Sequence, residues 1–142
     1  MEDLESAVEL LRGLIDERDE NLAPAVTQNI QPLLRVIMSN DVNIEIKEEI
    51  FEILAFVSDF SSISREELLK NDCLMNMIIG ILQQMKNQEK LLQFAALTLS
   101  NMASSPSAKA ALKKYESELM MIGFSDDSLA GIISNILAEL SH

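Results

Sequence analysis

Residues 91–106, LLQFAALTLSNMASSP, decide the fold class of this chain. Apolar and small residues recur here at three- and four-residue steps, the spacing that places side chains on one face of an α-helix. They form two flanks, with Leu91, Ala95, Leu99 and Met102 on one and Leu92, Ala96 and Ala103 on the other. A helix that is apolar on more than one side is normally packed between two layers. The stretch therefore predicts a buried helix inside a layered helical protein.

The same spacing continues over nearly the whole chain. Glycine (4) and proline (3) are too scarce for a turn-rich β architecture, which favours an all-α fold. Helix-end residues interrupt the pattern: Ser64 and Glu67 are spaced as a capping box, and Ser105 precedes Pro106 as an N-cap precedes a first-turn proline. We expect helices at residues 2–17, 22–28, 30–39, 43–59, 65–70, 73–86, 88–104, 106–115, 117–123 and 126–141.

An internal repeat relates these helices. ILAFVSDFSS at 53–62 aligns with TLSNMASSPS at 98–107 with an offset of 45, and LRGLID at 11–16 aligns with LAFVSD at 54–59 with an offset of 43. Ile30 and Leu74, in two shorter helices, lie 44 residues apart. A unit of this length cannot bury its own apolar face, so neighbouring units stack and share a core. The repeat therefore predicts a solenoid.

Two stretches carry a resemblance to the armadillo family, with HEAT repeats as the nearest alternative. FAALTLSNMASSPSAKAAL at 94–112 resembles the long third helix and the start of the next repeat, and LLKNDCLMNMIIGILQQM at 68–85 resembles the passage from the first to the second helix. The resemblance implies a right-handed α-solenoid of about three three-helix repeats. It implies a single domain over 1–142, with a leading helix at about 2–17 and repeats at about 18–60, 61–104 and 105–142.

In armadillo proteins, an asparagine near the end of the long helix points into a concave groove and hydrogen-bonds an extended peptide. The resemblance assigns this role to Asn101, whose amide both donates and accepts. Residues three and four positions earlier share its face, and the repeat offsets carry the face to the other long helices. The expected partner-binding residues are Glu9, Glu45, Glu49, Glu52, Phe56, Phe94, Leu97 and Asn101.

Each of these residues has a second interpretation. Asn101 can instead satisfy a neighbouring backbone at a repeat junction, Phe56 and Phe94 can belong to the core, and the glutamates can form a solvated surface. Leu97 occupies the position of a tryptophan in the nuclear-import members of the family, and the chain has no tryptophan. Recognition of import signals is therefore not expected.

The charge balance bears on the partner. The net charge is −12, from 23 acidic and 11 basic residues, so neither nucleic acid nor an anionic membrane is expected to bind. An acidic groove with apolar residues suits a protein or peptide segment that has Lys or Arg and apolar anchors. The predicted function is a non-catalytic protein-protein interaction scaffold.

The residue types of catalytic and metal sites are scarce. The only histidine is His142, and no glycine-rich phosphate loop follows a strand, so no catalytic, cofactor or metal site is expected. Cys73 is the only cysteine, the N-terminus does not resemble a signal peptide, and no apolar run is long enough for a membrane span. An intracellular protein, cytoplasmic or nuclear, is expected.

The alternative function is structural assembly through the ends of the solenoid. The last helix, SLAGIISNILAEL, is apolar over much of its circumference, which suggests contact with a larger protein or a homo-oligomer through this helix. Met75, Met77, Met85, Met120 and Met121 cluster in the second helices of two repeats. They are expected either to fill the core or to form an adaptable binding surface.

Overall fold

The structure is a computed structural model that describes residues 44–60, 62–70, 72–84 and 88–141. Its elements are α3 (Ile44–Phe60), α4 (Ser62–Leu69), α5 (Asp72–Gln84), α6 (Glu89–Ala103), α7 (Ala108–Leu112), the 3-10 helix η1 (Lys113–Tyr115), α8 (Glu116–Ser125) and α9 (Ala130–Ser141). No strand occurs among the described residues, which confirms the all-α prediction for them. The helices expected at 2–17, 22–28 and 30–39 lie outside the described part.

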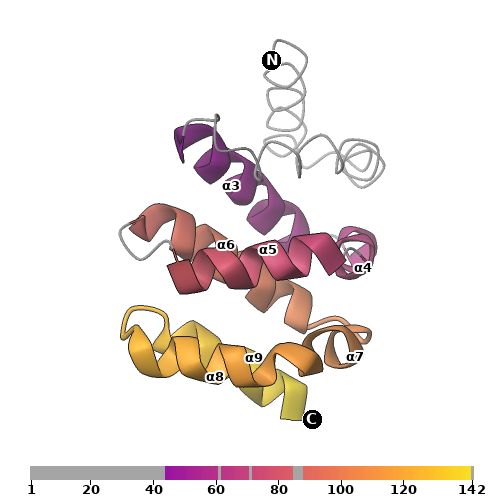
Figure 1. Cartoon of the computed structure of the whole chain (residues 1–142). Helices are drawn as coiled ribbons and strands as arrows, with labels where there is room; N and C mark the ends of the chain where they lie inside the picture. Colours follow the sequence, from indigo (N-terminus) through magenta and orange to yellow (C-terminus); the bar gives the residue numbers. More distant parts are fainter. Residues whose placement is uncertain (1–43, 61, 71, 85–87, 142) are drawn as a thin grey trace.

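The helices lie in successive tiers. Figure 1 shows α3, then the α5–α6 pair, then the α8–α9 pair, with the short helices α4 and α7 at one edge. Between tiers, α3 packs on α6, α6 packs on α9 and α5 packs on α8; within tiers, α5 packs on α6 and α8 on α9. The helix α6 is therefore covered on two sides, as its two apolar flanks predict.

One apolar core runs through all three tiers. It includes Phe51 in α3, Leu74 and Leu99 in the middle tier, and Leu119 and Ile136 in the last tier. Both flanks of α6 are buried, which leaves little of this helix in contact with solvent. Sharing a core between tiers stabilises helix pairs that could not bury their apolar faces alone.

The burial pattern of α3 recurs in α6 at the offset found in the sequence. Six buried residues of α3 have a buried counterpart 45 residues later: Ile50, Phe51, Ile53, Leu54, Val57 and Ser58 correspond to Ala95, Ala96, Thr98, Leu99, Met102 and Ala103. The two helices therefore bury the same face. The remaining face of each is the one on which the predicted binding residues lie.

The turn between α3 and α4 is held by an arginine. Arg65 Nη1 donates to the carbonyl oxygens of Ser58 (2.9 Å) and Asp59 (3.1 Å), which lie in the last turn of α3, where carbonyls lack helical partners. The helix α4 begins at Ser62, so Ser64 lies within the helix and is not its N-cap. The capping-box prediction was wrong in position by about half a turn.

Two helices begin later than expected because turns precede them. The N–H of Ala108 donates to the Ser105 carbonyl (3.1 Å), closing a turn in which Pro106 takes the position that favours proline. Before α9, the Asp126 side chain accepts from the backbone N–H (3.0 Å) and the hydroxyl (2.6 Å) of Ser128. This Asx-type turn delays the helix from the expected residue 126 to Ala130.

Candidate functional site

The exposed large apolar side chains of the described residues fall into two groups. Phe56 (47% exposed) and Leu97 (43%) lie on α3 and α6, whereas Met120 (44%), Met121 (69%) and Phe124 (81%) lie on α8. Scattered exposed apolar residues are ordinary, but grouped ones mark candidate interaction surfaces. The two groups define two surfaces, and the first coincides with the face predicted from the sequence.

We call the first surface the α3–α6 face. It consists of the residues of these two helices that the sequence analysis assigned to the groove: Glu45, Glu49, Glu52, Phe56, Phe94, Leu97 and Asn101. None of them is fully buried, and the two helices that carry them are packed side by side. Phe94 is partly buried against the core, and the rest of its side chain is accessible at this face. Glu9 lies outside the described residues.

A polar seam joins the two helices beneath this face. Asn101 Nδ2 donates to the Ala55 carbonyl (2.9 Å) and to Ser58 Oγ (3.2 Å), and the Ser58 hydroxyl donates to the same carbonyl (3.1 Å). One turn earlier, Thr98 Oγ1 lies 2.8 Å from the Phe94 carbonyl and 3.4 Å from the Phe51 carbonyl. These bonds fix the register of α6 against α3 and place Asn101 beside Phe56.

The seam changes what Asn101 can offer to a ligand. Its side-chain amide nitrogen, Nδ2, donates to two acceptors within the protein, so it is not available to the carbonyl groups of a bound peptide. Oδ1 is the remaining hydrogen-bonding atom of this half-buried side chain, and it can only accept. Asn101 therefore combines the junction role considered from the sequence with a reduced capacity for recognition.

The charge on the α3–α6 face is unevenly distributed. Glu45 is exposed and Glu49 and Glu52 are half-buried on α3, whereas the exposed positions at the start of α6 carry Glu89 and Lys90. Glu45, Glu49 and Glu52 each have an interaction within the protein and are not free carboxylates. The apolar pair Phe56 and Leu97 is therefore the stronger indication of binding.

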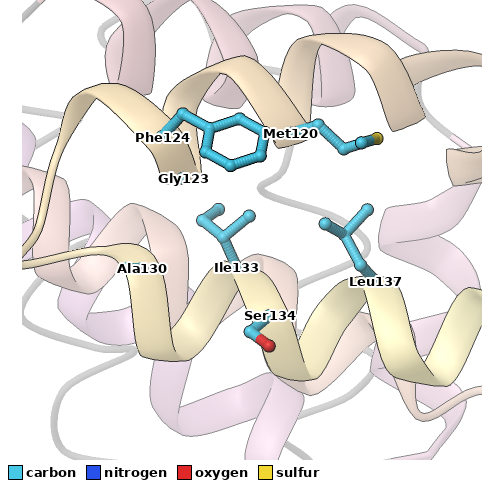
Figure 2. A pocket seen from close by; sticks show the side chains of 7 residues that line it. All are labelled: Met120, Gly123, Phe124, Ala130, Ile133, Ser134 and Leu137. Atoms are coloured by element: carbon cyan, nitrogen blue, oxygen red, sulfur yellow. The ribbon is translucent and has the colours of Figure 1, made fainter.

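The second surface is a groove between α8 and α9, which we call the α8–α9 groove. It has a volume of about 360 Å³ and is lined by Met120, Gly123, Phe124, Ala130, Ile133, Ser134 and Leu137. Figure 2 shows Met120 and Phe124 side by side on one helix, with Ile133 and Leu137 reaching toward them from the other. Ser134 supplies the only side-chain polar group of the lining.

A glycine lets the two walls of the groove approach. A Cβ on Gly123 would lie 3.2 Å from Cγ2 of Ile133, closer than such atoms normally come. The absence of a side chain at this position therefore permits the close packing of α8 on α9. It also leaves Met120 and Phe124, on either side, as the projecting residues of that wall.

The sequence predicted a contact surface on the last helix, but it did not predict the α8–α9 groove. It identified Met120 and Met121 as either core or surface, and the structure exposes both, while Met75 is fully buried. Phe124 was not singled out, because SELMMIGFS is apolar without a clear helical period and gives no sign of which residues face outward.

The described residues contain no group of three or more His, Cys, Asp or Glu side chains that could hold a metal ion. Among the same residues, no helix is both long and apolar enough to cross a bilayer. Comparison with known protein families, curated proteins and solved structures finds no match to the chain.

Proposed function

We propose that the tiers form a short right-handed solenoid of armadillo-like units. Two observations support this arrangement. The burial pattern of α3 recurs 45 residues later in α6. Side-chain hydrogen bonds between tiers also join residues separated by close to one repeat, as in Asn101 to Ser58 (43 residues), Ser107 to Glu66 (41) and Tyr115 to Asn76 (39). Such near-constant separations are what stacked copies of one unit produce.

On this scaffold, the α3–α6 face binds a segment of a partner protein, and the chain acts as a non-catalytic interaction module. The observation that carries the proposal is the pair Phe56 and Leu97, both more than 40% exposed on neighbouring helices of one face. Large apolar side chains held on rigid helices are effective anchors, because little conformational freedom is lost when they are covered.

The chemistry of the partner follows from the rest of the face. The carboxylates of α3 lie on the same side as Phe56, so a segment with Lys or Arg residues and one or two apolar side chains is the best match. Asn101 Oδ1 can accept one backbone N–H from such a segment. The charges speed the encounter, while the apolar contacts supply most of the affinity.

Selection from a random displayed peptide library tests this proposal. The protein is used as bait, and the selected peptides are then measured against the Phe56→Ser/Leu97→Ser double variant. We expect selected sequences to be rich in Lys, Arg and apolar residues, and to bind the variant at least tenfold more weakly, as expected for loss of anchors worth about 1.4 kcal/mol or more.

The matched control is Phe124→Ser, which removes an exposed phenylalanine from the other surface. It should leave unchanged the affinities of those peptides that the double variant weakens. Peptides that bind the double variant and the wild type equally well would place their site elsewhere. Circular dichroism of each variant verifies that it is folded, which is expected because all three side chains are substantially exposed.

A second candidate function is structural assembly through the end of the stack, either with another copy or with a larger protein. The exposed Met121 and Phe124 on α8 favour it, because the ends of a solenoid must be covered or polar to stay soluble alone. Light scattering over a hundredfold range of concentration distinguishes assembly with another copy from assembly with a larger protein. A constant monomer mass would exclude self-assembly.

A further inference from the structure

The α8–α9 groove is the place where a next tier would stack. The sequence of α9 aligns with that of α6 equally well at offsets of 34 and 38. At the offset of 38, the residues of α9 that line the groove, Ala130, Ile133, Ser134 and Leu137, correspond to Leu92, Ala95, Ala96 and Leu99 of α6. All four residues of α6 are buried, because α6 lies between α3 and α9. Among their counterparts in α9, Ile133 is already buried beside Gly123 of α8, whereas Ala130, Ser134 and Leu137 are half-buried or exposed and have no described helix on their outer side.

The helix α8 shows the same relationship to α5. Met120 lies 44 residues after Asn76, close to one repeat length. Asn76 Oδ1 accepts a 2.7 Å hydrogen bond from the hydroxyl of Tyr115, at the start of the next tier. The position that contacts the following tier in α5 is therefore occupied by an exposed methionine in α8. The groove continues an interface that already exists inside the molecule.

The lining indicates what kind of ligand fits. A small-molecule site normally has several polar groups that converge on the ligand, but Ser134 is the only polar side chain here. A groove between two helices instead accepts the ridge of side chains on a third helix. Met120 adds adaptable apolar surface to the lining, which suits a helix whose apolar residues vary in size.

The surrounding charge distinguishes a foreign helix from a second copy. Residues 116–141 contain no Lys or Arg. Their charged residues are Glu116, Glu118, Asp126, Asp127 and Glu139, of which Glu118 has a buried carboxylate oxygen; the nearest cations in sequence are Lys113 and Lys114, ahead of α8. Two copies joined through this groove would bring these carboxylates together, and like charges placed opposite one another oppose association. A helix that carries Lys or Arg beside its apolar stripe would match them.

We propose that the α8–α9 groove binds an amphipathic helix of a partner protein, with apolar residues at helical spacing and Lys or Arg along the margins of that stripe. The helix would occupy the position of a further tier and cover Met120, Phe124 and Leu137. This site is separate from the α3–α6 face; it rests on the second candidate function, assembly through the end of the stack, and names the chemistry of the partner that this end would bind.

Two pools of synthetic helical peptides, about 20 residues long so that they can be helical, test this proposal. In both pools the apolar positions i, i+3, i+4 and i+7 vary among Leu, Ile, Met and Phe; the margins are Lys in one pool and Glu in the other. The full chain is used as bait, and the best binders of each pool are measured by fluorescence anisotropy. We expect the best Lys-margin peptide to bind at least tenfold more tightly than the best Glu-margin peptide.

Variants then locate the site. Phe124→Ser should weaken the Lys-margin peptide at least tenfold and leave the fold intact, because this side chain is 81% exposed. Phe56→Ser, the matched phenylalanine of the other surface, should leave its affinity unchanged. Failure of the Lys-margin pool to bind, equal binding by both pools, or equal binding by the Phe124→Ser variant would overturn the proposal. A dimer that Phe124→Ser dissociates would also overturn it, by assigning the groove to a second copy.

Discussion

Replacement of Asn101 by alanine should destabilise the protein by removing the seam between α3 and α6. The side chain donates two hydrogen bonds, to the Ala55 carbonyl at 2.9 Å and to Ser58 Oγ at 3.2 Å. A neutral hydrogen bond contributes about 0.5–1.5 kcal/mol net, so their loss costs about 1–3 kcal/mol. The higher helix propensity of alanine offsets about 0.6 kcal/mol of this loss in the free energy of unfolding. We expect the free energy of unfolding to fall by about 1–2 kcal/mol.

The upper end of this range is not expected, because neither acceptor is left without a partner. The Ser58 hydroxyl still donates to the Ala55 carbonyl at 3.1 Å after the amide has been removed. Asn101→Asp should cost more than alanine, since it directs a carboxylate oxygen toward the Ala55 carbonyl oxygen, which places two acceptors together with no proton between them.

Urea denaturation followed by far-ultraviolet circular dichroism measures both changes. Asn135→Ala is the control, because Asn135 is exposed on α9 and its replacement changes helix propensity without breaking the seam. It should be neutral or slightly stabilising. Equal unfolding free energies for Asn101→Ala and Asn135→Ala would show that the seam does not hold the tiers together.

Two further predictions concern packing between and within tiers. Gly80→Ala should stabilise α5 by about 0.5–1 kcal/mol, because the new Cβ would meet nothing within 4 Å. Gly123→Ala should raise the free energy of unfolding by less, because its Cβ would lie 3.2 Å from Ile133 Cγ2. Equal gains in chemical denaturation would contradict that geometry. Tyr115→Phe should lower stability by about 0.5–1.5 kcal/mol by removing the 2.7 Å bond to Asn76. A double-mutant cycle with Asn76→Ala checks this, and strictly additive effects would argue against the bond.

The sequence predicted the long helices well because their burial is periodic. The expected helix at 88–104 is found at Glu89–Ala103, and the expected helix at 43–59 is found at Ile44–Phe60, with the described residues beginning at 44. The repeat offset of 45 reappears as a shared burial pattern in the same two helices. Regular spacing of this kind reports which face is covered, whatever covers it.

The helix starts were predicted less well, because local side-chain chemistry sets them. Nothing in the apolar spacing indicates that Arg65 reaches back to the end of α3, or that Asp126 binds Ser128 ahead of α9. The α8–α9 groove was missed for a related reason. Its position depends on where α8 and α9 meet and on the close contact at Gly123, which are properties of the tertiary structure.

The candidate binding residues were predicted as a face rather than as individual contacts. Helical spacing placed Phe56 and Leu97 on the uncovered side of α3 and α6, where they are exposed. It could not show that the Asn101 amide nitrogen donates both of its hydrogen bonds within the protein, because the two acceptors lie 43 and 46 residues away in the chain. Long-range partners of a single side chain have no signature in local spacing.

Chemical-shift mapping by NMR, with a peptide taken from the library selection, locates the partner-binding surface directly. The perturbed amide and methyl signals should cluster on one side of α3 and α6, around Phe56, Leu97 and Asn101. Signals of Met120, Met121 and Phe124 should be unchanged. Perturbations confined to α8 and α9, or spread over the whole molecule, would contradict the assignment of partner binding to the α3–α6 face.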